Sequence, residues 1–320
     1  MSLIEQAAQR LEQLRKAGVE IPSAPQETPP EQISAARRSE ESVGASPEVP
    51  VSVQPQTPPA ASPAINTPEM SMSRKVDIDL DVLAASGIIR PDSARSRLSD
   101  EFRVIKRPLI DNAMGKGPAR IKDGNLIMIT SALPGEGKTF TAANLAVSIA
   151  MELDNTVMLV DADVARPTLL NKLGLPQAKG LLDVLVDSSV SLSQVLLRTN
   201  IEKLTLLPAG TQHPRATELL ASDAMVRLLE EMSSRYSDRI IIFDSPPLLV
   251  TTEARALASH MGQVVVVVKS EGTSQADVKH ALAAIESCPV RLMLLNQAKT
   301  ATKDGYGYGY GYGYGYGNAA

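Results

Sequence analysis

Tryptophan is absent from this 320-residue sequence, and aromatic residues make up only 3% of it. A single cysteine, Cys288, excludes an internal disulfide framework and fits a reducing compartment. Long apolar runs are missing: the run at 264–268 is too short to cross a bilayer, and no basic-then-apolar signal opens the chain. The formal net charge is −4, so no global basic field favours nucleic acid. We therefore expect a cytoplasmic protein that does not bind nucleic acid.

The two ends of the chain differ in composition from its middle. Residues 1–19 predict an amphipathic helix, because a serine and a glutamate have capping-box spacing ahead of an apolar stripe. Residues 20–74 hold half of the 22 prolines, which is typical of a disordered linker. Residues 301–320 repeat Gly-Tyr, and glycine at every second position predicts a flexible tail with exposed phenols. We expect the folded domain at 75–300.

Strand-like and helical segments alternate within the expected domain. Most of the strand-like runs are continuously apolar, as in a sheet covered on both faces. The alternation implies right-handed crossovers, and hence a doubly wound α/β domain with a mainly parallel sheet. The expected strands are 126–130, 156–161, 204–208, 239–244, 263–268 and 291–295, and the expected helices are 77–86, 92–113, 138–153, 181–187, 215–235, 252–259 and 273–286.

The helix expected at 92–113 has two contrasting faces. Its apolar face carries Leu98, Phe102, Ile105 and Leu109. A charged face of this kind is usually solvated, but it also suits a contact between subunits. The residues assigned to the charged face are Arg95, Arg97, Arg103, Lys106 and Arg107.

The segment 126–144 has the pattern of a strand, a phosphate loop and a helix. Its glycines let backbone N–H groups surround phosphates, and the helix N-terminus adds partial positive charge. Lys138 is expected to reach the β- and γ-phosphates, and the Thr139 hydroxyl to bind Mg²⁺. A chance glycine-rich turn is the alternative. The residues expected to hold the nucleotide are Pro134, Gly135, Glu136, Gly137, Lys138, Thr139 and Phe140.

Acidic residues follow two other expected strands. Asp161 and Asp163 come after one apolar run, and Asp244 ends another. Carboxylates just past buried parallel strands lie at the nucleotide edge of the sheet. We expect Asp161 and Asp244 to join Thr139 as metal ligands, and Lys138, Asp161 and Asp163 to be catalytic. For Asp161 and Asp163, helix capping towards Thr168 is the alternative, and the division of base and metal roles between them stays open.

These motifs resemble those of the bacterial tyrosine kinases of polysaccharide export. The loop at 131–139, Ser-Ala-Leu-Pro-Gly-Glu-Gly-Lys-Thr, is similar to the first Walker motif of that family. Val-Asp-Ala-Asp-Val-Ala-Arg-Pro is similar to its second motif, and Ile-Ile-Ile-Phe-Asp-Ser-Pro-Pro to its Walker B motif. The terminal tyrosine cluster resembles its autophosphorylation tail. The start of the chain, the linker and the tail also look similar to the autokinases of exosortase-type exopolysaccharide systems.

The resemblance implies a protein-tyrosine autokinase that uses ATP and Mg²⁺ and regulates exopolysaccharide biosynthesis, with Asn296 near the adenine base. It implies a ring-like homo-oligomer in which one tail enters a neighbouring site. It also implies activation by the cytosolic end of a membrane chain-length regulator, recruitment to the inner face of the plasma membrane, and a tyrosine phosphatase as a partner. The implied phosphoacceptors are Tyr306, Tyr308, Tyr310, Tyr312, Tyr314 and Tyr316.

The sequence departs from the expected patterns in three places: the phosphate loop, the second motif and the oligomerisation helix. Ala132 stands where the phosphate loop usually begins with glycine. In the second motif Ala165 occupies the usual arginine position and Arg166 follows. The family's oligomerisation helix carries Glu-x-x-Arg-x-x-Arg, which here reads Asp100, Arg103 and Lys106, and lysine lacks the bidentate fork of arginine.

Two other functions are compatible with the same motifs. One is a partitioning or positioning ATPase that switches its dimer state, but the signature lysine of those proteins is replaced by Leu133. The other is a non-catalytic nucleotide-binding scaffold whose Gly-Tyr tail makes low-complexity contacts.

Overall fold

Eight strands form one sheet in the computed structural model, which describes residues 73–93 and 95–299. The expected N-terminal helix and Gly-Tyr tail, and nearly all of the expected linker, lie outside those residues, so the domain boundaries stay predictions. Every pair of neighbouring strands is parallel except β4 and β5, which confirms the doubly wound, mainly parallel architecture. In sheet order the strands are β1 (Arg74–Val76), β4 (Leu197–Thr199), β5 (Leu204–Leu207), β3 (Thr156–Asp161), β6 (Arg239–Asp244), β2 (Leu126–Ser131), β7 (Gln263–Lys269) and β8 (Val290–Asn296).

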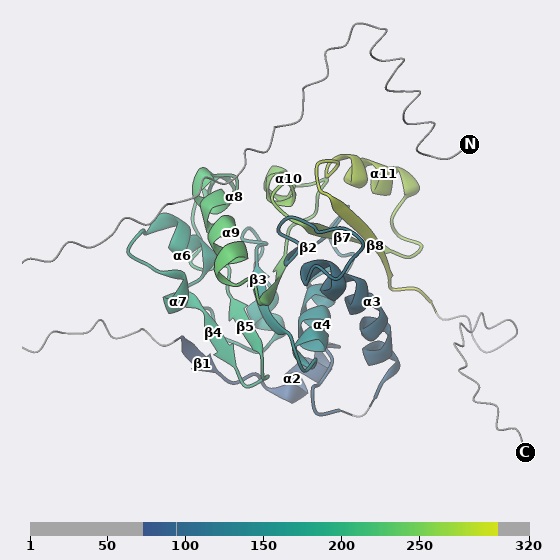
Figure 1. Ribbon diagram of the computed structural model, residues 1–320, viewed down its shortest axis with the longest axis horizontal. Coiled ribbons are helices and arrows are strands. Elements are labelled where there is room, and N and C mark those ends of the chain that lie inside the picture. The colour runs from purple at the N-terminus through teal and green to yellow at the C-terminus, as the bar shows by residue number, and fades with distance from the viewer. Residues whose placement is uncertain (1–72, 94, 300–320) are drawn as a thin grey trace, which may run out of the picture. The chain divides into compact units, whose positions relative to one another are not determined.

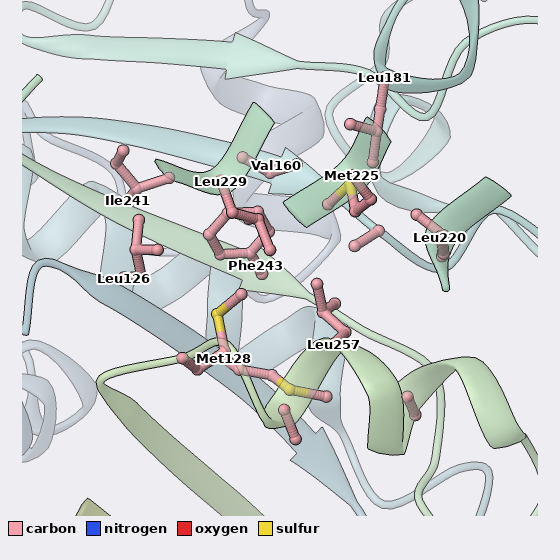
Figure 2. Packing of buried hydrophobic residues seen from close by; sticks show 14 of the residues in the cluster. Leu126, Met128, Val160, Leu181, Leu220, Met225, Leu229, Ile241, Phe243 and Leu257 are labelled. Atoms are coloured by element: carbon pink, nitrogen blue, oxygen red, sulfur yellow. The ribbon is translucent and has the colours of Figure 1, made fainter. Parts of the chain in front are cut away.

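The central strands are buried on both faces because their side chains alternate between two cores. In β2, Leu126 and Met128 belong to one hydrophobic cluster, and Ile127 and Ile129 belong to the other. Figure 2 shows the first cluster, in which Phe243 of β6 lies among side chains from the neighbouring strands and helices. Apolar residues at every position of a strand are therefore required here, because neither face is open to water.

The helices divide between the two faces of the sheet. Side chains of α2 to α5 belong to the cluster that contains Ile127, and side chains of α6 to α11 belong to the cluster around Phe243. Figure 1 shows α3 beside α4 and, apart from them, α8 beside α9. No described helix is long and apolar enough to cross a membrane. The helices are α2 (Leu80–Ala85), α3 (Arg97–Ala113), α4 (Lys138–Ala150), α5 (Leu169–Lys172), α6 (Leu181–Val186), α7 (Leu192–Val195), α8 (Ala216–Leu220), α9 (Asp223–Arg235), α10 (Thr252–Ala258) and α11 (Gln275–Ala283).

Two helix predictions depart most from the structure, and the other predicted helices have bounds within three residues of the observed ones. The expected helix 215–235 is two helices, because the Ser222 hydroxyl accepts the N–H of Met225 and starts α9 afresh. The helix expected from residue 92 begins only at 97, where Ser96 and Ser99 form a reciprocal capping box. Serine oxygens compete with the helical backbone and so favour helix starts. The short strands β1 and β4 and the short helices α5 and α7 were not predicted.

The assignment of Lys106 to an exposed charged face was also wrong. Lys106 is 4% exposed, and its Nζ lies 2.5 Å from the carbonyl oxygen of Ser148 and 2.6 Å from Glu152 Oε1. It shares one side of α3 with Phe102 and Ile110, which precede and follow it by four residues. Lys106 therefore joins α3 to the end of α4, and it is unavailable for the subunit contact that the sequence suggested.

Removing Glu152 should cost far more stability than removing an exposed acid of the same helix pair. Glu152→Ala leaves the Lys106 ammonium buried without its counter-charge, and we expect a loss of about 2–3 kcal/mol in the free energy of unfolding. Glu101→Ala is the matched control, because its pair with Arg97 is exposed and contributes about 0.5 kcal/mol or less. Urea unfolding measures both, and equal losses would contradict the role given to Lys106.

Candidate active site

The loop between β2 and α4 has the backbone geometry of a phosphate-binding loop. Gly135 and Gly137 have φ values of 81° and 101°, in the left-handed region that other residues avoid. Lys138 begins α4, so the free N–H groups and the positive end of that helix point to the loop. The expected strand, loop and helix are therefore present, and a chance turn is excluded.

The loop is braced from the end of β8. The side-chain amide of Asn296 donates to the carbonyl oxygen of Glu136 at 2.9 Å, and that of Gln297 donates to Gly135 at 3.3 Å. A Cβ atom on Gly137 would collide with the Asn296 amide. Asn296 thus lies at the rim of the loop, and its contact with a base stays a prediction. Gln297 was missed, since a polar residue after an edge strand carries no signal by itself.

Two of the expected nucleotide ligands direct their side chains into the protein. The carboxylate of Glu136 is 2% exposed and accepts the N–H of Leu133 at 2.8 Å and the hydroxyl of Thr273. The Phe140 ring packs edge-on against Phe102, with 6.3 Å between centroids. Only the backbone N–H groups of Glu136 and Phe140 are available to phosphates. Thr273 was not predicted, because its role depends on a loop more than a hundred residues away.

The acids expected at the strand ends meet beside the loop. Asp161 ends β3 and Asp244 ends β6, and the two are direct partners in the sheet register. Each is 1% exposed, whereas Asp163, two residues beyond β3, is only partly buried. Lys138 is 8% exposed, and its charge acts on both Asp163 and Asp244. The structure therefore brings together Lys138 and all three acids named from the sequence.

Burial raises the pKa of these carboxyl groups. It is the main cause for Asp161, whose pKa rises to about 8, and the charge of Asp244 adds to the rise. Burial likewise raises the pKa of Asp244 to about 7, although the Thr139 hydroxyl and Lys138 oppose it. The pKa of Asp163 is raised by burial and lowered in part by Lys138. The cations that act on these acids, Lys138 among them, therefore do not offset the effect of burial on the carboxyl groups.

The unpaired oxygens of these acids fit a divalent cation. Among the described residues, Asp161 Oδ1 and both carboxylate oxygens of Asp244 are buried without a hydrogen-bond partner. The Thr139 hydroxyl adjoins them and lies 3.5 Å from Thr168 Oγ1. Mg²⁺ at phosphate sites takes one or two carboxylates and completes its shell with phosphate oxygens and water. Helix capping is also correct in part, because Asp161 Oδ2 accepts the N–H of Leu169 at 3.2 Å.

One further acid at the site was missed. Glu253, in the first turn of α10, is 4% exposed, and its charge raises the pKa of Asp163. A glutamate in a first helical turn is ordinary capping in a sequence, so no local signal distinguished it.

A phosphate loop, a helix N-terminus and convergent acids on a doubly wound sheet define a P-loop nucleotide-binding domain. A family model described as an AAA domain matches residues 124–296. The tyrosine-protein kinase YwqD of Bacillus subtilis is 37% identical over 225 residues, which cover 68% of this chain and 89% of that protein. The chain belongs to the bacterial tyrosine-protein kinases, as its motifs predicted. The narrower similarity to exosortase-associated autokinases stays a prediction.

The chain also matches longer relatives in sequence and solved structures in fold. The tyrosine-protein kinase wzc of Salmonella typhimurium is 30% identical over 162 residues, which cover 51% of this chain and 22% of that protein. The chimerical protein CapA2B2 matches with a TM-score of 0.54 and 28% identity, over 69% of this chain and 93% of the other. The kinase domain of the Escherichia coli tyrosine kinase ETK shares the fold, with a TM-score of 0.57 and 23% identity over 75% and 88%.

Gly137→Ala should weaken nucleotide binding much more than the same change at Gly115. Both glycines have positive φ values, so both substitutions cost about 1 kcal/mol of backbone strain. Only at position 137 does the new methyl group meet Asn296, whereas nothing lies within 4 Å of it at position 115. Calorimetric titration with ATP and Mg²⁺ measures the difference. Equal affinities for the two variants would show that the brace by Asn296 is unimportant.

Asp161→Asn should flatten the dependence of stability on pH. In the nucleotide- and Mg²⁺-free protein the pKa of Asp161 is about 8, well above the value of about 4 for an aspartate in the unfolded chain. The contribution of Asp161 to the free energy of unfolding is therefore fully present below about pH 4 and is lost as the pH rises towards 8. The loss from this group amounts to at most about 1.4 kcal/mol per pH unit. Asparagine cannot titrate, and urea unfolding at several pH values compares the slopes. Parallel curves for the wild type and the variant would contradict a buried, uncompensated Asp161.

Proposed function

We propose that this protein is an ATP- and Mg²⁺-dependent protein-tyrosine autokinase, which transfers the γ-phosphoryl group to tail tyrosines of a neighbouring copy. One observation carries the proposal: buried carboxylate oxygens without partners lie beside a phosphate loop, on a chain that also carries a terminal tyrosine repeat. The acceptors are Tyr306, Tyr308, Tyr310, Tyr312, Tyr314 and Tyr316.

The donor half of the site consists of the loop, Lys138 and the buried acids. The N–H groups of residues 134–140 surround the phosphates, and Lys138 stabilises the negative charge that develops on the γ-phosphoryl oxygens. Asp161, Asp244 and Thr139 would hold Mg²⁺, which supplies further charge neutralisation when it is bound. Asn296, Gln297 and Glu136 hold the loop in this geometry through their hydrogen bonds.

Asp163 is the acid best placed to receive the acceptor's proton. It is partly exposed, whereas Asp161 and Asp244 are almost fully buried. The tyrosine oxygen forms a bond to the γ-phosphorus while the bond to the β–γ bridging oxygen breaks, and ADP leaves with that electron pair. The phenolic proton passes to Asp163. The raised pKa of Asp163, caused chiefly by burial, suits a group that must bind this proton and then release it.

The biological setting follows from the family. We infer a cytoplasmic kinase, drawn to the inner face of the plasma membrane by the cytosolic end of a chain-length regulator, which controls exopolysaccharide biosynthesis and export. A ring-like oligomer permits transfer between copies, and a tyrosine phosphatase reverses it. Within the chain, Asp100 is already paired with Arg95 and Arg103, Arg107 is paired with Glu152, and Lys106 is buried, so a subunit contact through α3 would have to compete with these ion pairs.

Intact-mass measurement of the tail tests the kinase function directly. The full chain is incubated with ATP and Mg²⁺, and we expect several phosphates on the segment 305–317. Lys138→Met should remove the labelling, and replacement of all six tail tyrosines by Phe should remove most of it while ATP still binds. Release of inorganic phosphate with an unmodified tail would instead indicate an ATPase switch, and neither product would indicate a nucleotide-binding scaffold.

A further inference from the structure

A groove opens next to the catalytic acids, beyond the ends of β3 and β5. It consists of two adjoining cavities, of about 710 and 510 Å³, which share Ala165 and Gln212. One wall is the loop after Asp163, and the other is the loop after β5. Thr168 lines the groove, and its hydroxyl lies 3.5 Å from that of Thr139 in the phosphate loop. The groove is therefore continuous with the donor half of the site.

The loop after β5, which forms one wall of the groove, is tied to the start of α6 by hydrogen bonds. The carboxylate of Asp183 accepts the N–H of Gly180 at 2.8 Å and the N–H of Thr211 at 3.0 Å. A Cβ atom on Gly180 would collide with the carbonyl oxygen of Pro208, and Gly210 has a φ value of 95°. These two glycines let the loops come together, so the groove is a built feature of the fold.

The groove is rimmed by positive charge. Arg166 and Lys179 line it and are exposed, and no carboxylate is among its lining residues. Asp183 is outside this lining, where it accepts backbone N–H groups and the charge of Lys179 lowers its pKa in part. Arg166 is close to the catalytic acid, because its own N–H donates to Asp163 Oδ1 at 3.3 Å and its charge lowers the pKa of that carboxyl. Arg166 thus lies beside Asp163, and Lys179 adds a second positive charge elsewhere along the groove.

The groove lies on the side of the phosphate loop opposite the expected base. In the sheet, β3 and β5 are on one side of β2, and β8 with Asn296 is on the other. A nucleotide whose base lies near Asn296 leaves the groove free for the acceptor. In an extended chain, alternate residues point to one side with a spacing of about 7 Å, so the tyrosines of the Gly-Tyr repeat share one face.

We infer that this groove binds a phosphotyrosine of a second copy's Gly-Tyr tail, so that one phosphorylation primes the next. The inference rests on the proposed kinase function. A phosphotyrosine carries about −1.5 to −2 charges and strong acceptor oxygens, which suit Arg166 and Lys179. With that phosphate in the groove, a tyrosine one or more repeats away reaches Asp163. Its oxygen bonds to the γ-phosphorus, its proton passes to Asp163, and ADP leaves with the electrons of the broken bond.

The positive charges of Arg166 and Lys179 also limit how many phosphates a bound tail can carry. Two cations match about one phosphotyrosine, whereas a tail with all six tyrosines modified carries about −9 to −12 charges. Such a tail exceeds the positive charge of the groove and is repelled by the nearby acids. The groove therefore retains partly modified tails and releases fully modified ones.

Synthetic tail peptides test the inference. The enzyme is the full chain with its six tail tyrosines changed to Phe, which removes competition from its own tail. The two probes are the peptide 305–317 unmodified and the same peptide with phosphate only at the position of Tyr310. We expect the primed peptide to show a KM about three- to tenfold lower, from two charge-assisted contacts at an exposed site.

Variants that remove the positive charges of the groove test whether the lower KM of the primed peptide depends on this groove. Arg166→Gln with Lys179→Gln should reduce the ratio of the two KM values towards one. Lys122→Gln is the matched control, because that exposed lysine lines neither cavity of the groove, and it should keep the ratio. Equal KM values for the two peptides with the unaltered groove would contradict the claim that one phosphorylation promotes the next. A preference for the primed peptide that remains in the Arg166→Gln, Lys179→Gln variant would contradict the claim that the groove binds the phosphotyrosine. Transfer to neither peptide would refute the kinase function itself.

Discussion

Asp161 and Asp244 lie side by side where β3 and β6 end, and both are almost fully buried. Burial raises the pKa of both carboxyl groups, and the charge of Asp244 raises that of Asp161 further. Lys138 and the N-terminus of α4 bring positive charge to this point. If Mg²⁺ binds as proposed, metal binding and the stability of the domain would be coupled through the same two side chains.

The donor and acceptor sides of the site are built differently. The phosphate loop is held at its own Glu136 by two residues from outside it, Thr273 in the segment after β7 and Asn296 at the end of β8. On the other side, the groove after β3 and β5 has exposed cations, Arg166 and Lys179, among its lining residues. Rigid placement suits a nucleotide whose γ-phosphoryl group must lie in line with its attacker. An open rim suits an acceptor that must be exchanged for the next tyrosine of a repeat.

Particular residues show how far sequence reasoning reaches. The structure places the phosphate loop beside Asp161, Asp163 and Asp244, as expected, because strand ends and glycine turns constrain where such residues lie, and their roles stay predictions. Lys106 was misplaced, because charge was taken as evidence of exposure although the residue lies between Phe102 and Ile110 on the packed side of α3. The break at Ser222 was missed, since a serine that caps a helix looks the same as one within a helix.

The sequence by itself determined the fold class, the loop that holds phosphates and the family, because each depends on local patterns: apolar runs, turn glycines and acids at strand ends. Only the tertiary structure decided which side chains brace the loop, that Lys106 is a buried link between α3 and α4, and that a cationic groove adjoins Asp163. These features join segments far apart in the chain. Their contacts depend on how the strands are ordered in the sheet, and no local pattern encodes that order.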